Sequence, residues 1–407
     1  MNNRRKFLKQ TGLAAGVMAI SQPHQIFAET KRQGPKLRIG IIGCGGRAHN
    51  VGEMALEDGR YEIVALADYF QDAVDAIGEK YAVPANRRYT GLHCFKRLID
   101  AGGIDIVAVL SPPYFHPEQA EAAVEAGLHV WLAKPIAVDA PGVARIAAAA
   151  RRAAARQRCF LVDFQTRALD HYHEAARRVA GGDLGKLGYA EIEATSLAFK
   201  LRVPHGNMET RLKNWLQWKD LCGENLIEFS IHAIDLASLM IGRPPISATG
   251  FCERNLIKHI PGDVRDVTNV VYDYGDGLKC VLRAKRFDHH QISGGIDLAL
   301  FGDKGGLFAN YKGEVYIKGD QPFSGDRFLG EKIRGIYNIG ILKNWGTFYQ
   351  NITQGDYRQA TVQPSVDSHY LALLGREAAY AQGATVTWQE IINSQKTMSF
   401  DTSELTT

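Results

Sequence analysis

The sequence is poor in cysteine and proline: its 407 residues include 6 cysteines and 14 prolines, and no two cysteines form a Cys-x-x-Cys pair. These spacings give no reason to expect a metal cluster, so we predict no bound metal. A core of the size that this length allows does not need a disulfide framework, and we expect the thiols to be structural. With 45% hydrophobic residues, the composition excludes a collagen-like or largely disordered chain, and the length predicts two domains.

An excess of one charge is also lacking outside the N-terminus. Segment 1–28 contains four basic residues and no acidic one, which accounts for the whole formal net charge of +4. Beyond this segment, 44 basic residues face 44 acidic ones. A neutral chain gives no electrostatic reason to expect a nucleic acid partner.

The basic N-terminal segment is typical of an exported protein. Residues 3–9 resemble the twin-arginine (Tat) motif, a short apolar stretch follows at 13–20, and Ala28 offers a cleavage site. We therefore predict a Tat signal peptide over 1–28 and a linker over 29–35, with the Tat machinery as a partner and the periplasm as the destination. The alternative is a basic arm followed by a short helix. No apolar run reaches the ~20 residues that span a bilayer, so we expect no membrane contact after signal removal.

The first half of the remaining chain alternates short apolar runs with helical patterns. Such alternation predicts a parallel, doubly wound sheet with helices on both faces. This arrangement is the Rossmann fold, which we place at residues 36–163. The predicted strands share a nearly continuous apolar character and cover residues 36–42, 62–67, 105–110, 129–132 and 159–162.

A glycine-rich loop follows the first predicted strand. The loop and the next helix supply five candidate cofactor-binding residues, Gly43, Gly45, Gly46, Arg47 and Ala48. Gly43 permits a tight turn, Gly45 lets the backbone approach a pyrophosphate, and Ala48 lets the helix pack closely on the strand. Asp68 ends the next predicted strand, where its carboxylate would accept hydrogen bonds from ribose hydroxyls and repel a 2′-phosphate. NAD is therefore favoured over NADP. The alternative is a glycine turn that binds no nucleotide.

Three further candidates follow later strands at the same edge of the sheet, where open α/β sheets bind their ligands. Ser111 and His116 belong to a proline-containing turn, and a structural role in that turn explains His116 equally well. Lys134 precedes Pro135 at the end of the strand predicted at 129–132. Partial burial could lower the pKa of this lysine and suit it to proton transfer. The alternative for Lys134 is a solvated surface charge.

The second half has a different pattern. Alternating segments joined by turns predict a large, mainly antiparallel sheet with one open face, in an α+β domain at residues 164–361. Residues 224–241 predict one helix, with Glu228 and His232 four positions apart on one face and Asp235 adjoining. A carboxylate beside an imidazole can orient it and raise its proton affinity. The alternatives are a helix that satisfies its own polar groups and a metal site, which lacks a third ligand.

Together these motifs resemble the Gfo/Idh/MocA family of NAD(P)-dependent sugar and inositol oxidoreductases, over residues 36–388. Lys134-Pro135 matches the end of the family's Glu-Lys-Pro motif, although Ala133 replaces the glutamate. Glu228 and His232 match an acidic residue and a catalytic histidine four positions later, with Glu228 in place of the commoner aspartate.

The resemblance implies roles for these residues. His232 would remove the hydroxyl proton of a sugar as a hydride passes to the nicotinamide, with Lys134 assisting and Glu228 holding the imidazole. It also implies a returning helix within 362–388 that packs on the Rossmann domain, a tail at 389–407, and a homo-oligomer built on the open sheet. The residues that would border the substrate are Gln165, Arg167 and Asp235.

The sequence thus predicts an NAD-dependent oxidoreductase that acts on a hydroxyl of a sugar, glycoside or inositol-like polyol. Because the periplasm offers no obvious pool that recycles NADH, a redox-neutral cycle is the alternative. Such a cycle would belong to a glycosidase that oxidises carbon 3 transiently, or to a sugar–sugar oxidoreductase. A non-catalytic protein that retains NAD and a sugar is a further alternative. Trp215 and Trp218 would either stack on the sugar ring or belong to the core.

Overall fold

The computed structural model describes residues 34–287, 295–325 and 335–407. Gly34–Thr407 form one compact unit. The predicted signal peptide at 1–28 and most of the predicted linker lie outside the described residues. Within the described part, none of the helices has both the length and the apolar character needed to cross a membrane.

A six-stranded parallel sheet forms the first half of this unit, as the sequence predicts. Its strand order is β3-β2-β1-β4-β5-β6, so the order reverses between β1 and β4. The carboxyl ends of β1 and β4 therefore flank the crevice where such sheets bind ligands. The strands are β1 (Leu37–Ile42), β2 (Tyr61–Asp68), β3 (Arg88–Thr90), β4 (Ile106–Val109), β5 (His129–Ala133) and β6 (Phe160–Asp163).

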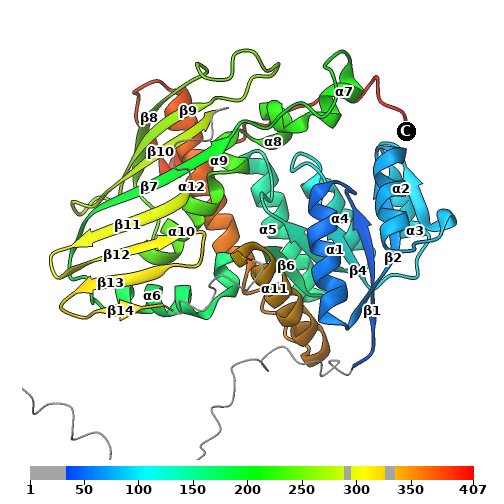
Figure 1. Ribbon diagram of the computed structural model, residues 1–407, viewed down its shortest axis with the longest axis horizontal. Coiled ribbons are helices and arrows are strands. Elements are labelled where there is room, and N and C mark those ends of the chain that lie inside the picture. The colour runs from blue at the N-terminus through cyan, green and yellow to red at the C-terminus, as the bar shows by residue number, and fades with distance from the viewer. Residues whose placement is uncertain (1–33, 288–294, 326–334) are drawn as a thin grey trace, which may run out of the picture. The chain divides into compact units, whose positions relative to one another are not determined.

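Helices cover both faces of this sheet (Figure 1). Every residue of β4 and β6 is buried, which explains the continuous apolar runs in the sequence. Asp139 caps α5, because its side chain accepts a hydrogen bond from the amide of Gly142 at 2.7 Å. The helices are α1 (Gly46–Asp58), α2 (Gln71–Lys80), α3 (Cys94–Asp100), α4 (His116–Glu125) and α5 (Ala140–Ala155).

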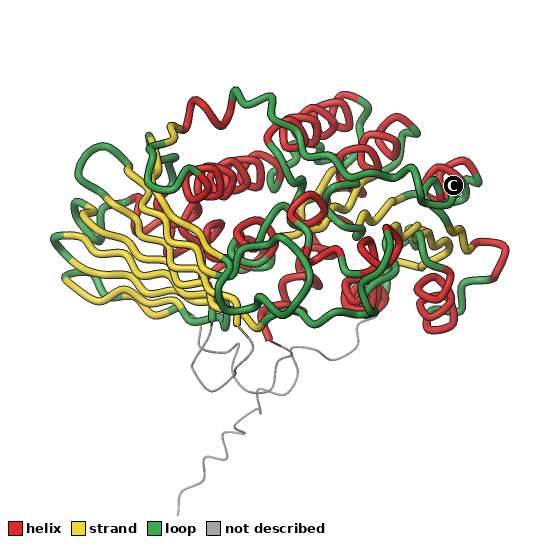
Figure 2. The backbone as a smooth tube through the Cα atoms, turned by 90° about the horizontal axis from the view of Figure 1, so that it is seen from above, coloured by secondary structure: helices red, strands yellow, loops and turns green. Residues whose placement is uncertain are grey.

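A mixed sheet of nine strands dominates the second half, with helices against one face (Figure 2). Among the described strands, β7 and β10 pair in parallel and the other neighbours pair antiparallel, which confirms the predicted, mainly antiparallel sheet. Along β10, Cys280, Leu282 and Ala284 are buried, and the residues between them face outward. The strands are β7 (Leu187–Leu197), β8 (Ser247–Glu253), β9 (Val267–Asp273), β10 (Lys279–Phe287), β11 (Ile296–Gly302), β12 (Gly305–Asn310), β13 (Val315–Gly319), β14 (Phe323–Ser324) and β15 (Val386–Thr387).

The buried face of this sheet packs on α6 (Asp170–Ala180), α10 (Ile231–Ile241) and α12 (Val362–Tyr380). α12 is the helix that the sequence predicts after residue 361. It contacts β8 and α10 on one side and α5 of the Rossmann domain on the other, so it joins the two halves (Figure 1).

The prediction of a single helix over residues 224–241 is wrong. Two helices, α9 (Asn225–Glu228) and α10, meet at a turn over Phe229 and Ser230. The amide of Ser230 donates to the carbonyl of Asn225, five residues back, instead of continuing the four-residue pattern of an α-helix. Glu228 and His232 therefore lie on different helices.

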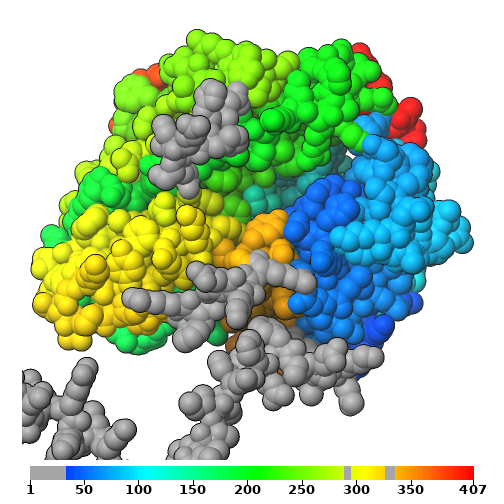
Figure 3. Space-filling model, in the orientation of Figure 1, coloured from blue at the N-terminus to red at the C-terminus, as the bar shows by residue number. Residues whose placement is uncertain are grey.

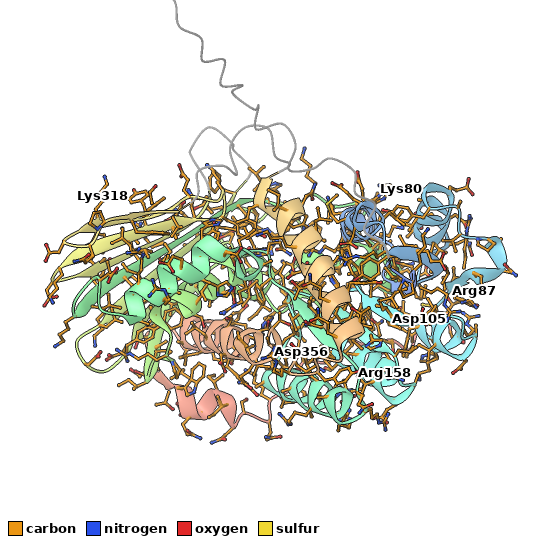
Figure 4. The ribbon with its side chains drawn as sticks, turned by 90° about the horizontal axis from the view of Figure 1, so that it is seen from below. Lys80, Arg87, Asp105, Arg158, Lys318 and Asp356 are labelled. Atoms are coloured by element: carbon orange, nitrogen blue, oxygen red, sulfur yellow. The ribbon has the colours of Figure 1, made fainter. Side chains whose placement is uncertain are left out.

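A long helix that the sequence analysis does not predict, α11 (Gly335–Gln354), packs against α1 of the Rossmann domain. Trp345 of α11 stacks on Trp131 with ring centroids 5.1 Å apart, and its indole donates to the carbonyl of Val51 at 3.0 Å. Asp356 follows α11, and its carbonyl accepts a hydrogen bond from the Cys159 thiol of the Rossmann domain at 3.6 Å. Figure 4 shows Arg158 close to Asp356. This helix thus completes the Rossmann domain, although it follows the second half in sequence.

Candidate active site

The glycine loop between β1 and α1 is tightly packed on one side and open on the other. Gly43 has a φ of +95°, and a Cβ there would lie 2.4 Å from the backbone nitrogen of Ser111, so this position requires glycine. A Cβ on Gly45 or Gly46 would meet no atom within 4 Å. The loop therefore exposes its backbone at the N-terminus of α1, as pyrophosphate binding requires.

A pocket extends from this loop along the carboxyl ends of β1, β2 and β4, and a hollow between blue and green residues marks this region in Figure 3. It brings together six of the predicted cofactor-binding residues, Gly43, Gly45, Gly46, Arg47, Asp68 and Ser111. Ala48 is fully buried beneath them, as close packing of helix on strand requires. His116 and Lys134 do not line this pocket.

Asp68 is held at the pocket edge by the backbone. Its carboxylate accepts hydrogen bonds from the amides of Cys44 at 2.6 Å and Phe70 at 2.9 Å. Burial raises the pKa of Asp68, and these two donors oppose the shift. Each carboxylate oxygen has a second lone pair, so Asp68 can still accept a hydrogen bond from a ribose hydroxyl.

The contacts of His116 favour the structural role in the turn, the alternative to a place beside the cofactor. The ring is buried, with Nδ1 2.8 Å from the carbonyl oxygen of Pro135 and Nε2 2.7 Å from that of Ser111. Neither nitrogen is left for a ligand. The imidazole instead holds the turn that follows Lys134.

Lys134 is buried between the two halves of the fold. Its ammonium donates to the carbonyl oxygen of Glu228 at 2.7 Å and to Oε1 of the same residue at 3.3 Å, and 10% of its side chain is exposed. Burial lowers the pKa of Lys134 and raises that of Glu228, while the attraction between the two charges opposes both shifts. Lys134 is therefore not a solvated surface charge, and its burial favours release of a proton.

His232 lies beside this pair, but Glu228 does not hold it as the sequence predicts, because the carboxylate of Glu228 bonds to Lys134. The imidazole is 6% exposed, and its centroid is 4.6 Å from that of the Tyr311 ring. Its Nδ1 has no hydrogen-bond partner among the described residues. Burial lowers the pKa of His232 well below its usual value, and the charges of Lys134 and Arg47 add to this effect. A neutral imidazole of this kind can accept a proton.

Arg47 joins the glycine loop to this cluster. Its guanidinium donates to the carboxylate of Asp163 and lies 4.7 Å from the centroid of the Tyr337 ring. Within the described residues, its buried Nε and Nη1 have no hydrogen-bond partner. Arg47 therefore has donors left for an anionic group, which fits the pyrophosphate of a dinucleotide.

Three residues that the sequence analysis missed complete the cluster: Asp163, Tyr311 and Asn344. Asp163 accepts hydrogen bonds from the amides of Asn344 and Gln165, each at 2.6 Å, and the hydroxyl of Tyr311 donates to Gln165 at 2.5 Å. Asp163 ends β6, and its place at the carboxyl end of a strand is a signal that could have identified it. Tyr311 follows β12 and Asn344 lies on α11, where nothing in the local sequence indicates such a contact.

The residues predicted to border the substrate lie in the packed interior instead. Gln165 and Asp235 are fully buried. Arg167 Nε donates to Asp235 Oδ1 at 2.7 Å, and the hydroxyl of Ser368 on α12 donates to the same oxygen at 2.7 Å. Arg167 and Asp235 hold each other and α12, while Gln165 holds Asp163, so we assign all three a supporting position.

Trp215 and Trp218 both pack against a small hydrophobic cluster, which agrees with the core alternative of their prediction. Trp215 lines the nucleotide pocket, and the Trp218 ring lies 4.5 Å from the guanidinium of Arg211.

All six cysteines are buried and free, which fits a structural role for the thiols. In the part of the chain that the structure describes, no group of three or more His, Cys, Asp or Glu side chains could hold a metal ion.

The chain is similar to several known oxidoreductases. The D-glucoside 3-dehydrogenase of Escherichia coli (strain K12) is 27% identical over 214 residues, or 52% of this chain and 56% of that protein. The inositol 2-dehydrogenase of Rhizobium meliloti (strain 1021) is 23% identical over 353 residues, or 84% of this chain and 96% of that protein. The crystal structure of an aldose-aldose oxidoreductase from Caulobacter crescentus has a TM-score of 0.68 at 20% identity and covers 86% of this chain and 99% of that one.

One family model covers the parallel sheet, and a second covers part of the mixed sheet. The NAD-binding Rossmann fold of the oxidoreductase family matches residues 37–164, and the GFO/IDH/MocA C-terminal domain matches residues 172–308. The open glycine backbone, the unpaired donors of Arg47 and the carboxylate of Asp68 fit the cofactor that this fold binds. The chain belongs to the Gfo/Idh/MocA family, and it is an NAD(P)-dependent oxidoreductase.

Proposed function

We propose that this protein oxidises a hydroxyl of a sugar, glycoside or inositol-like polyol, with NAD as the preferred cofactor. The observation that carries the proposal is the buried Lys134–Glu228 pair beside the neutral imidazole of His232. Arg47 connects these groups to the nucleotide pocket. The family and the similarity to an inositol dehydrogenase and a glucoside dehydrogenase support a polyhydroxylated substrate.

The bound nicotinamide supplies a hydride acceptor. His232 takes the hydroxyl proton on its imidazole, because burial keeps the ring neutral. The Lys134 ammonium stabilises the negative charge that develops on the substrate oxygen. Glu228 keeps Lys134 in place and offsets its charge when no substrate is present.

Asp68 supports NAD as the preferred cofactor. Two backbone amides orient its carboxylate at the edge of the pocket. A carboxylate there accepts hydrogen bonds from the ribose hydroxyls and repels the 2′-phosphate of NADP.

We further propose Tat-dependent export to the periplasm, supported by the twin-arginine pair and the absence of acidic residues from 1–28. Arg4→Lys together with Arg5→Lys should keep the precursor in the cytoplasm, as cell fractionation would show. Unchanged delivery to the periplasm would contradict this route.

A redox-neutral cycle is the second candidate function, favoured by the proposed export and by the similarity to a glucoside 3-dehydrogenase. A glycosidase that oxidises carbon 3 transiently would acidify the neighbouring proton, so solvent deuterium should enter carbon 2 of the product. A sugar–sugar oxidoreductase should carry deuterium from a labelled donor to an acceptor. Stoichiometric release of NADH with an oxidised sugar would contradict both cycles and leave the dehydrogenase.

A homo-oligomer built on the open sheet face is also proposed. Apolar side chains at least 41% exposed lie on four strands of this sheet: Tyr189, Phe251, Val271 and Phe301. Light scattering should give a mass above that of one chain, and Phe251→Lys with Val271→Lys should lower it.

The experiment that tests the main proposal has two parts. Denaturation of the purified protein, followed by chromatography, should release NAD or NADH. A panel of sugars, glycosides and inositols should then change the nicotinamide absorbance. If no member of the panel does so in a protein that contains the nucleotide, the proposed substrate class is contradicted.

A further inference from the structure

A small hydrophobic cluster lies apart from the two main cores and joins three separate stretches of chain. One stretch is the Rossmann edge, the second is residues 199–222, which we name the cover segment, and the third is residues 394–407, which we name the tail. The buried members of this cluster are Leu212, Leu221, Phe400 and Leu405. The Phe400 ring meets that of Phe115 edge-on at 6.3 Å between centroids. Figure 1 shows α7 (Met208–Lys213) of the cover segment and the tail meeting near α2.

Polar contacts tie both stretches to the Rossmann domain. Lys213 Nζ donates to the carboxylate of Asp72 at 2.7 Å and lies 4.1 Å from the centroid of the Phe70 ring. In the tail, the carbonyl of Thr406 accepts a hydrogen bond from the amide of Leu92 at 2.9 Å. The cover segment and the tail are therefore each anchored beside the pocket.

The cover segment forms one wall of the nucleotide pocket. Arg202, Leu212, Lys213 and Trp215 line it together with Asp68. Leu212 belongs to both the wall and the hydrophobic cluster that contains Phe400 and Leu405, and the guanidinium of the neighbouring Arg211 lies 5.5 Å from the centroid of the Phe400 ring, so the tail supports the wall. Among the described residues, the guanidinium of Arg202 forms no ion pair and no hydrogen bond. Burial lowers the pKa of Arg202, and the negative charge of Asp68 opposes this shift.

We propose that the cover segment binds the adenosine half of the dinucleotide and that the tail holds this wall closed, so that the cofactor leaves slowly and stays through many turnovers. This rests on the nucleotide site of the proposed function but on no particular sugar. Trp215 and Leu212 offer apolar surface to a base, and Arg202 offers a cation to its ring or to the ribose. Release requires the wall to move, and this movement must break the buried contacts of Leu212. These contacts therefore lower the dissociation rate of the cofactor.

The test measures cofactor release without any sugar. The protein is loaded with NADH and mixed with excess NAD, and the loss of nicotinamide fluorescence gives the dissociation rate. Phe400→Ala should increase this rate by about tenfold or more, because it removes a buried aromatic side chain that supports the wall. The matched control is Lys396→Ala, which changes a tail side chain that pairs with Glu377 outside the cluster. An unchanged rate in Phe400→Ala, or an equal increase in both variants, would overturn the proposal.

A second variant serves if Phe400→Ala does not fold. Lys213→Gln removes the tether to Asp72 without opening the cluster, and it should also increase the dissociation rate severalfold. An unchanged rate there, in a variant with unaltered thermal unfolding, would overturn the role of the cover segment. Failure of the sugar panel with a slow, Phe400-dependent release would contradict the proposed substrate class only. Rapid release from the unmodified protein that still oxidises a sugar would overturn only the retention.

Discussion

Lys134 Nζ lies 2.7 Å from the carbonyl oxygen of Glu228 and 3.3 Å from Oε1 of its carboxylate. These residues stand 94 positions apart in the chain and come from the two halves of the fold. Because both side chains are buried, each charged group is stabilised by the opposite charge of the other. Removal of one side chain leaves its partner unpaired. The carbonyl contact also places Lys134 at the end of α9, next to the turn that leads into α10 and His232.

Lys134→Met should lower kcat by about 10²–10⁴-fold while leaving NADH affinity close to normal, since Lys134 does not line the nucleotide pocket. Steady-state kinetics and fluorescence titration would measure the two effects. Lys318→Met is the matched control, because Lys318 is an exposed residue of β13 in the second sheet (Figure 4). A normal kcat in Lys134→Met would contradict the role of this lysine.

Glu228→Gln should shift the pH profile of kcat. The carboxylate of Glu228 raises the pKa of Lys134 against the lowering by burial, so its loss lowers that pKa further. If the ammonium form is required, activity in the variant should decline at a lower pH on the alkaline side than in the unmodified protein. An alkaline limb that does not move would show that Lys134 does not need its proton.

His232→Ala should lower kcat by about 10²–10⁴-fold with NADH still bound, as expected for loss of a general base. The acid limb of the unmodified enzyme should lie well below pH 6.5, because burial lowers the pKa of His232 and keeps the imidazole neutral. His93→Ala, which changes an exposed histidine, provides the control. Full activity in His232→Ala would refute the proposed site.

Asp68→Asn should narrow the preference for NAD over NADP by about tenfold, or about 1.4 kcal/mol, because it removes the charge and keeps an oxygen acceptor. Arg202 lines the same pocket and can then pair with a 2′-phosphate. The double variant with Arg202→Ala should therefore lose the gain in NADP affinity. Equal affinities for the two cofactors in the unmodified protein would contradict the assignment of Asp68.

Acid should destabilise the fold through buried histidines. Burial lowers the pKa of His116 to about 4 and that of His369 to about 3. Below the ordinary value of about 6.5 the unfolded chain binds these protons and the folded protein does not, so the free energy of unfolding falls as the pH falls. Each histidine should cost about 2 kcal/mol between pH 7 and pH 5. Urea titrations should show a smaller loss in His369→Gln, whereas an equal loss would contradict this origin.

The sequence by itself determined the features that depend on near neighbours. The apolar runs and the glycine loop predict β1, β2 and the nucleotide crevice, because strand burial and the turn at Gly43 are local properties. The position of Lys134 at the end of a strand likewise predicts its place in the fold, since all carboxyl ends of a parallel sheet meet at one edge.

Only the tertiary structure decided which of these side chains meet. The turn at Phe229 and Ser230 separates Glu228 from His232, so Glu228 pairs with Lys134, and no helical spacing contains that information. Asp235 is occupied by Arg167 because η2 (Thr166–Ala168) and α10 pack together. The wall of the nucleotide pocket and α11 come from segments more than 100 positions beyond the glycine loop, and such contacts form only when the whole chain is packed.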